Sequence, residues 1–409
     1  MKKILQINIT ANWGSHGKIA EGIGLKMLGT GWESHIAYGR WLTPSKSQLY
    51  RIGSMTDEYI HGAMSYLFDC HGLCSKRATK KLLRFIRQLN PDIIHLHNIH
   101  GYYLHYPLLF SFLREWKKPV VWTLHDCWPY TGHCAHYMYA NCDKWKSECH
   151  HCPLLSNYPK CVLFDNSKRN YRLKRDAFLI PNLTLVPVSK WLEKELKSSF
   201  LADIPSRQIY NGIDTELFQP NSQHMAIREK YNIATDRQIV LGVASNWYRK
   251  GLPDFLRLAQ ILPANRYQVV MVGLKEKELQ QVPASVVGIP RTGNVEELIQ
   301  LYTTAAVLFN PTWEDNLPTT HLEAQACGTP VVSYDTGGCA ETISPQVGTI
   351  VPRGNLLQAL EAIEHAAELK PQNRDACRRF IIDNFNKEKN FGLYADLYSR
   401  LIKQGVPEN

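Results

Sequence analysis

Two successive runs of alternating strands and helices constrain the fold of this chain more than any other feature of its sequence. The first run occupies the N-terminal half, and the second begins near Leu183. Strands separated by helices of about 10–15 residues favour parallel, doubly wound sheets, so an α/β fold is predicted. Strands are predicted over residues 4–9, 34–38, 92–96, 119–124, 183–188, 238–243, 268–273, 307–310 and 331–334.

The length of 409 residues suits two domains, because single hydrophobic cores stop growing at about 250–300 residues. We expect two Rossmann-like domains that face each other across a central cleft. The first is predicted at residues 1–186 and the second at residues 187–390. A helix within residues 391–409 has one apolar face, and we expect this face to pack back on the first domain.

Composition argues against a disordered chain and against an integral membrane protein. The 44% hydrophobic and 21% charged residues are ordinary for a globular protein, and apolar runs such as 305–309 are only strand-sized. A strand-like run, Ile4–Ile9, follows Met1–Lys3 at once, where a signal peptide would have a longer apolar stretch. We therefore expect a cytoplasmic protein whose 11 cysteines are reduced or bind a metal.

The positive charge lies in the first half of the chain. Residues 1–186 carry 24 Lys and Arg against 12 Asp and Glu, whereas residues 187–409 carry 23 against 25. Such asymmetry indicates an anionic partner, which is a membrane surface, a diphosphate-linked acceptor or nucleic acid. A basic surface that only keeps the protein dissolved is the alternative.

A strand, a polar loop and a helix near residue 320 form the most informative segment. The strand 307–310 leads into a loop, and a helix is expected from Thr319. A helix start binds anions well, so a diphosphate is expected at Asn316, Leu317, Pro318, Thr319 and Thr320. Glu323 can then accept hydrogen bonds from a ribose, and Asp315 can reach sugar hydroxyls, although Glu323 can also simply pair within its helix.

This segment resembles the donor site of retaining family-4 glycosyltransferases with the GT-B fold. The resemblance lies in the eight-residue spacing of Asp315 and Glu323, the run Ala324–Val332 and the later run Thr336–Glu341. The motif Asn211–Asp214 is also similar to one in that family. Family members usually have glutamate at the first position, where this chain has Asp315 next to Glu314.

The resemblance implies transfer of a hexose-type sugar from a nucleotide-diphosphate sugar to a glycan or lipid-linked acceptor, with retention of configuration. It further suggests bacterial surface-polysaccharide assembly, with an acceptor carried on polyprenyl diphosphate. The chain would then be peripheral at the inner face of the membrane. Basic stretches at residues 76–87 and 168–175 are the expected contacts with anionic lipid.

Two further segments are expected to hold the phosphates. Arg249 and Lys250 follow a strand and supply cations for the leaving group, with Lys250 also expected to be catalytic. Because the chain has no Asp-x-Asp motif, no catalytic metal is expected. Gly14, Ser15 and Gly17 let the backbone approach a ligand at the first strand, and the missing G-x-G-x-x-G pattern argues against an NAD enzyme.

Histidine is the expected catalytic residue type on the N-terminal side. His125 follows the strand 119–124, and the resemblance implies that it contacts the donor sugar, whereas Asp315 acts from the other side. His95, His97 and His100 follow the preceding strand and are weaker candidates. A purely structural histidine is the alternative at each position.

A cysteine-rich segment at residues 127–161 is expected to be a loop held by a structural zinc ion. Its proposed ligands are Cys134, Cys142, Cys149 and Cys152, with Cys127 and Cys161 flanking them. The alternatives are free or variably oxidised thiols and, less favoured, disulfides. Histidines can replace a thiolate, and those nearby are His133, His136, His150 and His151.

Together these features predict a glycosyltransferase. An epimerase acting on nucleotide sugars, or a phosphorylase, is an alternative on the same fold. A nucleic-acid-binding protein that uses the basic half is an alternative of a different class, but it leaves the segment around Glu323 unexplained.

Overall fold

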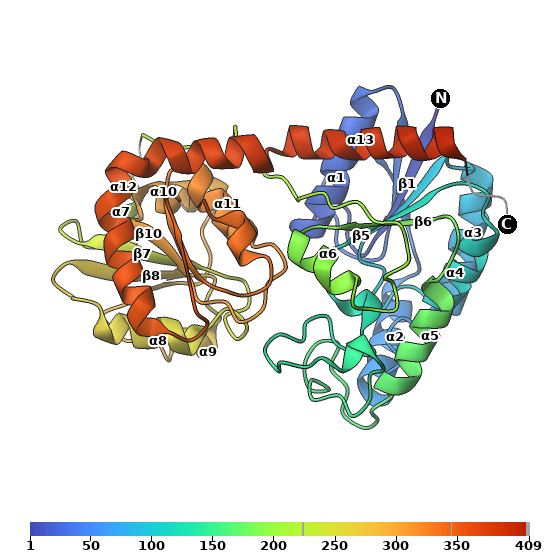
Figure 1. Cartoon of the computed structure of the whole chain (residues 1–409), viewed down its shortest axis with the longest axis horizontal. Coiled ribbons are helices and arrows are strands. Elements are labelled where there is room, and N and C mark those ends of the chain that lie inside the picture. The colour runs from blue at the N-terminus through green and yellow to red at the C-terminus, as the bar shows by residue number, and fades with distance from the viewer. Residues whose placement is uncertain (223–224, 345, 406–409) are drawn as a thin grey trace. The chain divides into compact units, whose positions relative to one another are not determined.

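A computed structural model of the chain describes residues 1–222, 225–344 and 346–405. The chain divides into two compact units (Figure 1). The first consists of Met1–Gly212 and Glu388–Asn409, and the second of Ile213–Lys387. Each unit contains its own six-stranded sheet.

The first unit is a doubly wound parallel domain. Its sheet has the order β3-β2-β1-β4-β5-β6, and every pairing in it is parallel. The strands are β1 (Lys3–Asn8), β2 (Glu33–Tyr38), β3 (Gln48–Arg51), β4 (Ile93–Leu96), β5 (Val120–Leu124) and β6 (Leu183–Pro187). The helices are α1 (Gly14–Gly29), α2 (Met55–Phe68), α3 (Lys76–Leu89), α4 (Tyr106–Glu115), α5 (Ser167–Phe178), α6 (Lys190–Leu196) and α13 (Lys387–Gln404).

The second unit repeats this topology. The order β12-β11-β10-β7-β8-β9 is the same winding when its strands are counted from β7, and all its pairings are parallel. The strands are β7 (Gln238–Val243), β8 (Tyr267–Val272), β9 (Val287–Ile289), β10 (Val307–Asn310), β11 (Val331–Tyr334) and β12 (Thr349–Val351). The helices are α7 (Ala226–Lys230), α8 (Leu252–Ile261), α9 (Glu276–Leu279), α10 (Val295–Thr304), α11 (Thr319–Ala326) and α12 (Leu356–Phe385). The predicted α/β class with two doubly wound sheets is confirmed.

Helices cover both faces of the second sheet, which explains why its central strands are apolar along their whole length. Side chains of α8 and α12 pack against one face, where Phe255 and Ile363 join Val240 and Phe309. Side chains of α10 and α11 pack against the opposite face, where Leu301 lies in the same cluster as other strand residues. Both faces are therefore buried, and only the strand ends remain available for ligands.

Helix α13 completes the core of the first unit. Its residues Phe391, Tyr394 and Tyr398 are buried in one cluster with Ile4 of β1 and Ile23 of α1. Figure 1 shows α13 (red) beside α1 within this unit. The helix therefore packs as the apolar face in its sequence suggests.

The boundary between the units differs from the predicted position between residues 186 and 187. That position falls inside β6, and the first unit continues to Gly212. The reason is a segment that pairs in parallel with β6, since Arg207 N donates to Leu185 O and Ile209 N donates to Pro187 O. These bonds tie residues beyond 186 to the edge of the first sheet.

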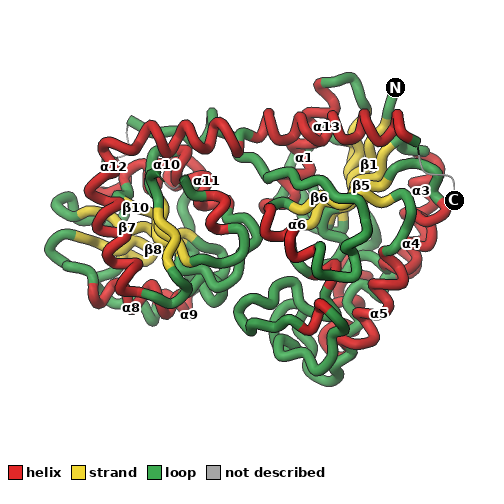
Figure 2. The backbone as a smooth tube through the Cα atoms, viewed as in Figure 1, coloured by secondary structure: helices red, strands yellow, loops and turns green. Residues whose placement is uncertain are grey.

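The cysteine-rich segment 127–161 is almost entirely loop (Figure 2). Its regular structure is limited to two short 3₁₀ turns, η1 (Trp128–Tyr130) and η2 (Lys144–Lys146). Lys174 of α5 anchors this segment, because its buried ammonium lies 2.6 Å from Trp128 O and 2.9 Å from Thr131 O.

None of the helices in the described ranges has the length and apolar character of a membrane span.

Candidate active site

The candidate residues of each unit follow the strands at which the winding of the sheet reverses. In the first sheet these neighbours are β1 and β4, and in the second they are β7 and β10. The loops after two such strands run to opposite faces and leave a crevice at the carboxyl ends, where ligands of open α/β sheets bind. The expected histidine and phosphate-binding segments all begin at these ends or at the adjacent β5.

Lys250 and Asp315 form an ion pair in the second unit. They lie in the loops after β7 and β10, and their side chains are 20% and 15% exposed. Burial acts to raise the pKa of Asp315, but the Lys250 ammonium outweighs it and the pKa lies below its usual range. The two residues that were predicted to serve the sugar and the phosphates are therefore brought together.

Backbone contacts hold these two loops against each other. Trp313 N donates to Arg249 O at 2.9 Å. Gly251 has a φ of +76°, and a Cβ there would lie 2.1 Å from Pro311 O, so this approach requires glycine. Arg249 thus contributes its backbone to the contact between the loops, and its side chain is half-buried beside them.

Helix α11 begins at Thr319, directly after Asn316, Leu317 and Pro318. Its early turns place backbone N–H groups beside the Lys250–Asp315 loops, which gives the charge pattern expected for an anion. One turn further, the hydroxyl of the buried Tyr302 donates to Oε2 of Glu323 at 2.8 Å. This bond fixes the orientation of the carboxylate that was predicted to bind a ribose.

His321 is a buried residue of α11 that the sequence reasoning missed. Its Nε2 lies 2.6 Å from the Asn310 side-chain nitrogen, and its Nδ1 lies 2.8 Å from the Thr342 hydroxyl. Burial lowers the pKa of His321 to about 3, so the ring is neutral and joins the end of β10 to α11. The sequence carried no signal for it, because α11 also holds polar residues such as Thr320, Glu323 and the buried Gln325.

The glycine turn after β1 adopts the backbone that its sequence predicts. Gly14 opens α1 with a φ of +67°, and a Cβ at Gly17 would lie 2.5 Å from the Thr10 hydroxyl. Between them, Ser15 is exposed and His16 is half-buried. His16, which was not among the predicted site residues, has its ring centroid 6.1 Å from that of His125.

A chain of hydrogen bonds fixes the proton of His125. The Gln6 amide nitrogen donates to Ala20 O at 2.7 Å, so its oxygen faces His97 Nε2 at 3.0 Å and accepts from it. His97 Nδ1, 3.2 Å from His125 Nε2, is then the acceptor. Burial keeps the pKa of both imidazoles well below the ordinary value, so each is neutral. His125 therefore carries its proton on Nε2, and its Nδ1 can only accept.

A second amide of β1 sets the opposite role for His16. Asn98 N donates to the Asn8 oxygen at 3.3 Å, so the Asn8 nitrogen donates to His16 Nδ1 at 3.2 Å. Burial lowers the pKa of His16 to about 4, and the neutral ring keeps its proton on Nε2. Gln6 and Asn8 lie two residues apart on one face of β1. Gln6 and Asn8 thus make His16 a donor and His125 an acceptor. This pair suits a hydroxyl group better than an anion, because a hydroxyl both donates and accepts.

The other histidines in and after β4 support this layer. His100 Nε2 lies 2.8 Å from the Asp126 carboxylate. Burial acts to raise the pKa of Asp126, but His100 and the Trp128 N–H lower it below the usual range. His95 Nδ1 lies 2.7 Å from the Tyr398 hydroxyl of α13, so this ring is buried structure and no ligand contact is expected of it.

The four cysteines proposed as zinc ligands border one pocket. Cys134, Cys142, Cys149 and Cys152 line it together with His133 and His150. In the described residues, however, no group of three or more His, Cys, Asp or Glu side chains is spaced to hold a metal ion. All are free thiols rather than disulfides. Zinc binding therefore stays a prediction.

Comparison with known proteins identifies the class. Residues 27–217 match the profile of Glycosyltransferase Family 4, and residues 224–383 match that of Glycosyl transferases group 1. Together with the two parallel sheets, these matches define a glycosyltransferase with the GT-B fold. The chain belongs to the family-4 type of these enzymes, as its sequence motifs predict.

Relatives extend the match over nearly the whole chain. It is 25% identical over 385 residues to the putative colanic acid biosynthesis glycosyl transferase WcaC of Escherichia coli. The aligned region covers 88% of this chain and 89% of that protein. Sucrose-phosphate synthase from Thermosynechococcus elongatus superposes with a TM-score of 0.72 at 17% identity, over 99% of this chain and 100% of that one. Anabaena HepE in complex with UDP-glucose superposes with a TM-score of 0.64 at 14% identity, over 98% and 100%. These structural likenesses concern the fold.

Proposed function

We propose that the chain transfers a hexose-type sugar from a nucleotide-diphosphate sugar to a hydroxyl of a glycan or lipid-linked acceptor, with retention and without a catalytic metal. The observation that carries the proposal is the Lys250–Asp315 pair beside the start of α11, with Glu323 one turn further along. A cation, a helix start and a carboxylate in this order match a diphosphate followed by a ribose. The family membership of the chain supports the same reading.

The leaving group explains the placement of Lys250. Breaking the sugar–phosphate bond leaves negative charge on the nucleoside diphosphate, and preorganised cations and N–H dipoles stabilise it. Lys250 supplies the cation and the N–H groups of Leu317, Thr319 and Thr320 supply the dipoles, with Arg249 beside them. Asp315 holds the ammonium in place and can accept hydrogen bonds from sugar hydroxyls.

Recognition of the sugar is assigned to the imidazoles of the first unit. His125 offers Nδ1 as an acceptor, and His16 offers Nε2–H as a donor. A sugar hydroxyl can satisfy both, because it donates and accepts at once. Neither neutral ring compensates the charge of a phosphate.

The complex of HepE makes UDP-glucose a reasonable first donor to test. The test is a thermal-shift panel of nucleotide sugars. A donor at 100 times its dissociation constant stabilises the folded chain by about 2.7 kcal/mol. Stabilisation by one donor and sugar transfer to a lipid-linked acceptor support the proposal. The absence of any shift across the panel contradicts it, and donor epimerisation without an acceptor favours the epimerase alternative.

We further propose that the protein binds its acceptor at an anionic membrane surface. Helix α2 supports this, because it exposes apolar side chains and buries polar ones, which is the reverse of an ordinary surface helix. Tyr59 and Ile60 are 70% and 59% exposed, whereas the buried positions of α2 are His61 and Ser65. The exposed apolar side chains continue from α2 into the segment 162–164, since Val162 N donates to Tyr66 O and Phe164 stacks on Phe68. Aromatic and aliphatic side chains in such a surface suit the boundary between lipid headgroups and acyl chains.

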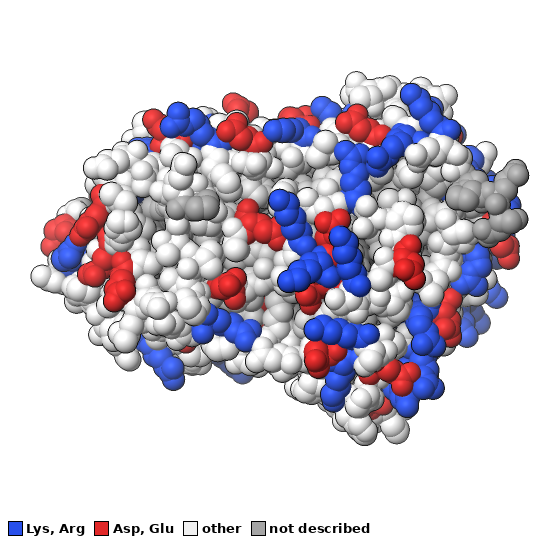
Figure 3. All heavy atoms as spheres, viewed as in Figure 1, with Lys and Arg blue, Asp and Glu red and all other residues white. Residues whose placement is uncertain are grey.

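Of the two predicted basic stretches, α3 is the better lipid contact. Its six basic residues are exposed, and none of them forms an ion pair in the part of the chain that the structure describes. By contrast, Glu148 pairs with both Lys168 and Arg172 of α5. Figure 3 accordingly shows acidic side chains among the basic ones over the α5 region. The basic residues of α3 are Lys76, Arg77, Lys80, Lys81, Arg84 and Arg87.

A further inference from the structure

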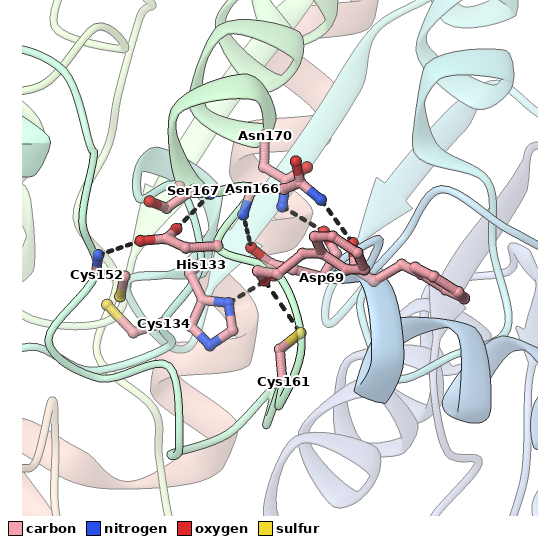
Figure 4. A network of polar contacts seen from close by, with 12 residues as sticks. Asp69, His133, Cys134, Cys152, Cys161, Asn166, Ser167 and Asn170 are labelled. Carbon is pink, nitrogen blue, oxygen red and sulfur yellow. Dashed lines mark hydrogen bonds and ion pairs between the residues drawn. The ribbon is translucent and has the colours of Figure 1, made fainter.

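The pocket of the cysteine-rich segment is bordered by soft metal-ligand side chains from separate turns of the loop. Cys134 follows η1, Cys149 follows η2, and Cys152 lies beyond it. The side chains of Cys134 and Cys152 lie close together (Figure 4). Gly132 N donates to Cys149 Sγ at 3.2 Å, a contact that favours a thiolate over a thiol. The pocket thus gathers sulfur from positions that no regular structure holds together.

His133 supplies an observation that is independent of the cysteines. Its side chain is fully buried, and its Nδ1 lies 2.6 Å from the Asp69 carboxylate. Asp69 is itself held by Asn166 N, 2.9 Å from its other oxygen (Figure 4). His133 therefore donates from Nδ1 to Asp69. Its Nε2, in the same pocket wall, is a buried atom without a hydrogen-bond partner among the described residues.

A buried polar atom without a partner costs free energy, and a metal ion that binds it removes that cost. A carboxylate that orients the far side of an imidazole is the usual arrangement around a metal-binding histidine. Thiolates and imidazole together favour zinc over hard cations. A loop of this length without regular structure also requires an internal tie.

We propose that the cysteine-rich segment binds one zinc ion through the thiolates of Cys134, Cys149 and Cys152, with a fourth ligand from His133 or Cys142. Each thiol releases its proton to solvent as its sulfur binds the ion. Because the ligands are not spaced for an ion as they stand, binding draws them toward the centre of the pocket. The zinc is structural, and its presence does not depend on the proposed transferase activity.

The experiment is metal analysis of the untagged full chain, purified with reductant and without chelator. We expect about one zinc per chain, retained in Cys74→Ser, whose half-buried thiol lies outside the pocket, and lost in Cys152→Ser. Less than about 0.2 zinc per chain in folded wild-type protein overturns the proposal. So does equal zinc in Cys152→Ser and Cys74→Ser.

Cobalt substitution keeps the test decisive if Cys152→Ser fails to fold. Cobalt in the wild-type chain is expected to give intense thiolate-to-metal absorption, and its absence contradicts thiolate ligation. Comparison of Cys142→Ser with His133→Asn assigns the fourth ligand to whichever variant loses zinc. Full zinc in both contradicts the four-coordinate site.

Discussion

Nε2 of His125 lies 3.2 Å from Nδ1 of His97, and this contact decides which nitrogen of His125 carries the proton. The direction of the bond comes from Gln6, whose amide nitrogen is committed to Ala20 O. The proton of one half-buried imidazole is thus fixed by three buried polar groups, which are the Ala20 carbonyl, the Gln6 amide and the His97 ring. Such a cost is expected at a functional site rather than in an ordinary core.

The variant Gln6→Glu should reverse this order. A carboxylate favours a doubly protonated His97, whose Nδ1–H then donates to His125 and drives the His125 proton from Nε2 to Nδ1. We expect nitrogen chemical shifts of labelled histidines to report that move, with turnover lower by about tenfold for one misplaced hydrogen bond. The exposed Gln88→Glu should change neither, and identical His125 spectra in wild type and Gln6→Glu would show that Gln6 does not set the tautomer.

Removal of Lys250 should separate catalysis from stability. Lys250→Ala is expected to reduce turnover by about 10²–10³-fold, as for other lost charge-stabilising donors. It also leaves Asp315 without its cation and should lower the free energy of unfolding by about 1–3 kcal/mol. The double variant Lys250→Met/Asp315→Asn should recover the stability in urea titrations without recovering turnover. Near-normal turnover of Lys250→Ala with unchanged donor affinity contradicts the role of Lys250.

Loss of the Tyr302 hydroxyl should weaken donor binding. In Tyr302→Phe, the Glu323 carboxylate loses the donor that orients it, which costs about 1.5 kcal/mol and raises the donor KM about tenfold. Tyr334→Phe is the matched control, because the buried Tyr334 hydroxyl has no hydrogen-bond partner within the described ranges. A fall in kcat at constant KM in Tyr302→Phe would place the effect in catalysis and contradict the ribose assignment.

The buried Lys174 should make stability depend on pH. Burial lowers its pKa to about 7, below the value of the unfolded chain, so the unfolded chain binds more protons from about pH 7 to 10. The free energy of unfolding therefore rises with pH over this window, by up to about 4 kcal/mol from this one group. Urea titrations with reductant at pH 7.5 and 9.5 should show the rise in wild type and in the exposed control Lys168→Met, but not in Lys174→Met.

Membrane binding should need both the apolar and the basic side chains of the α2–α3 region. Wild-type protein is expected to sediment with phosphatidylglycerol vesicles and not with phosphatidylcholine vesicles. Replacing Lys76, Arg77 and Lys80 by Gln should weaken binding about 100-fold, at about 1 kcal/mol per charge. The pair Tyr59→Ser/Ile60→Ser should also release the protein, whereas the exposed Leu357→Ser in the second unit should not. Equal binding to both vesicle types contradicts the proposal.

The sequence predicts the central strands well and the edges poorly. Strands such as β1 and β7 are buried on both faces, and their largely apolar, β-branched sequences reveal them. Three of the four edge strands, β3, β9 and β12, have three or four residues each and partly exposed patterns, so no periodicity marks them. The fourth, β6, is fully buried and was predicted.

The residues of the candidate site likewise divide into those that the sequence predicts and those that it does not. Asp315, Glu323 and Lys250 are found from motif spacing because each motif lies in one short segment. Contacts such as His97 with His125 join residues from different strands, and no spacing rule predicts them. His16 and His321 escaped because a single histidine near a helix start has no pattern of its own.

The contribution of α13 to the first unit has a consequence for synthesis of the chain. Trp32, Ile4 and His95 are covered by residues that the ribosome adds only after all of the second unit. The second unit is contiguous and can close its core as soon as it emerges, whereas the first must wait with an open hydrophobic face. A ribosome that stalls before codon 391 would therefore release a chain with one finished domain and one that attracts chaperones.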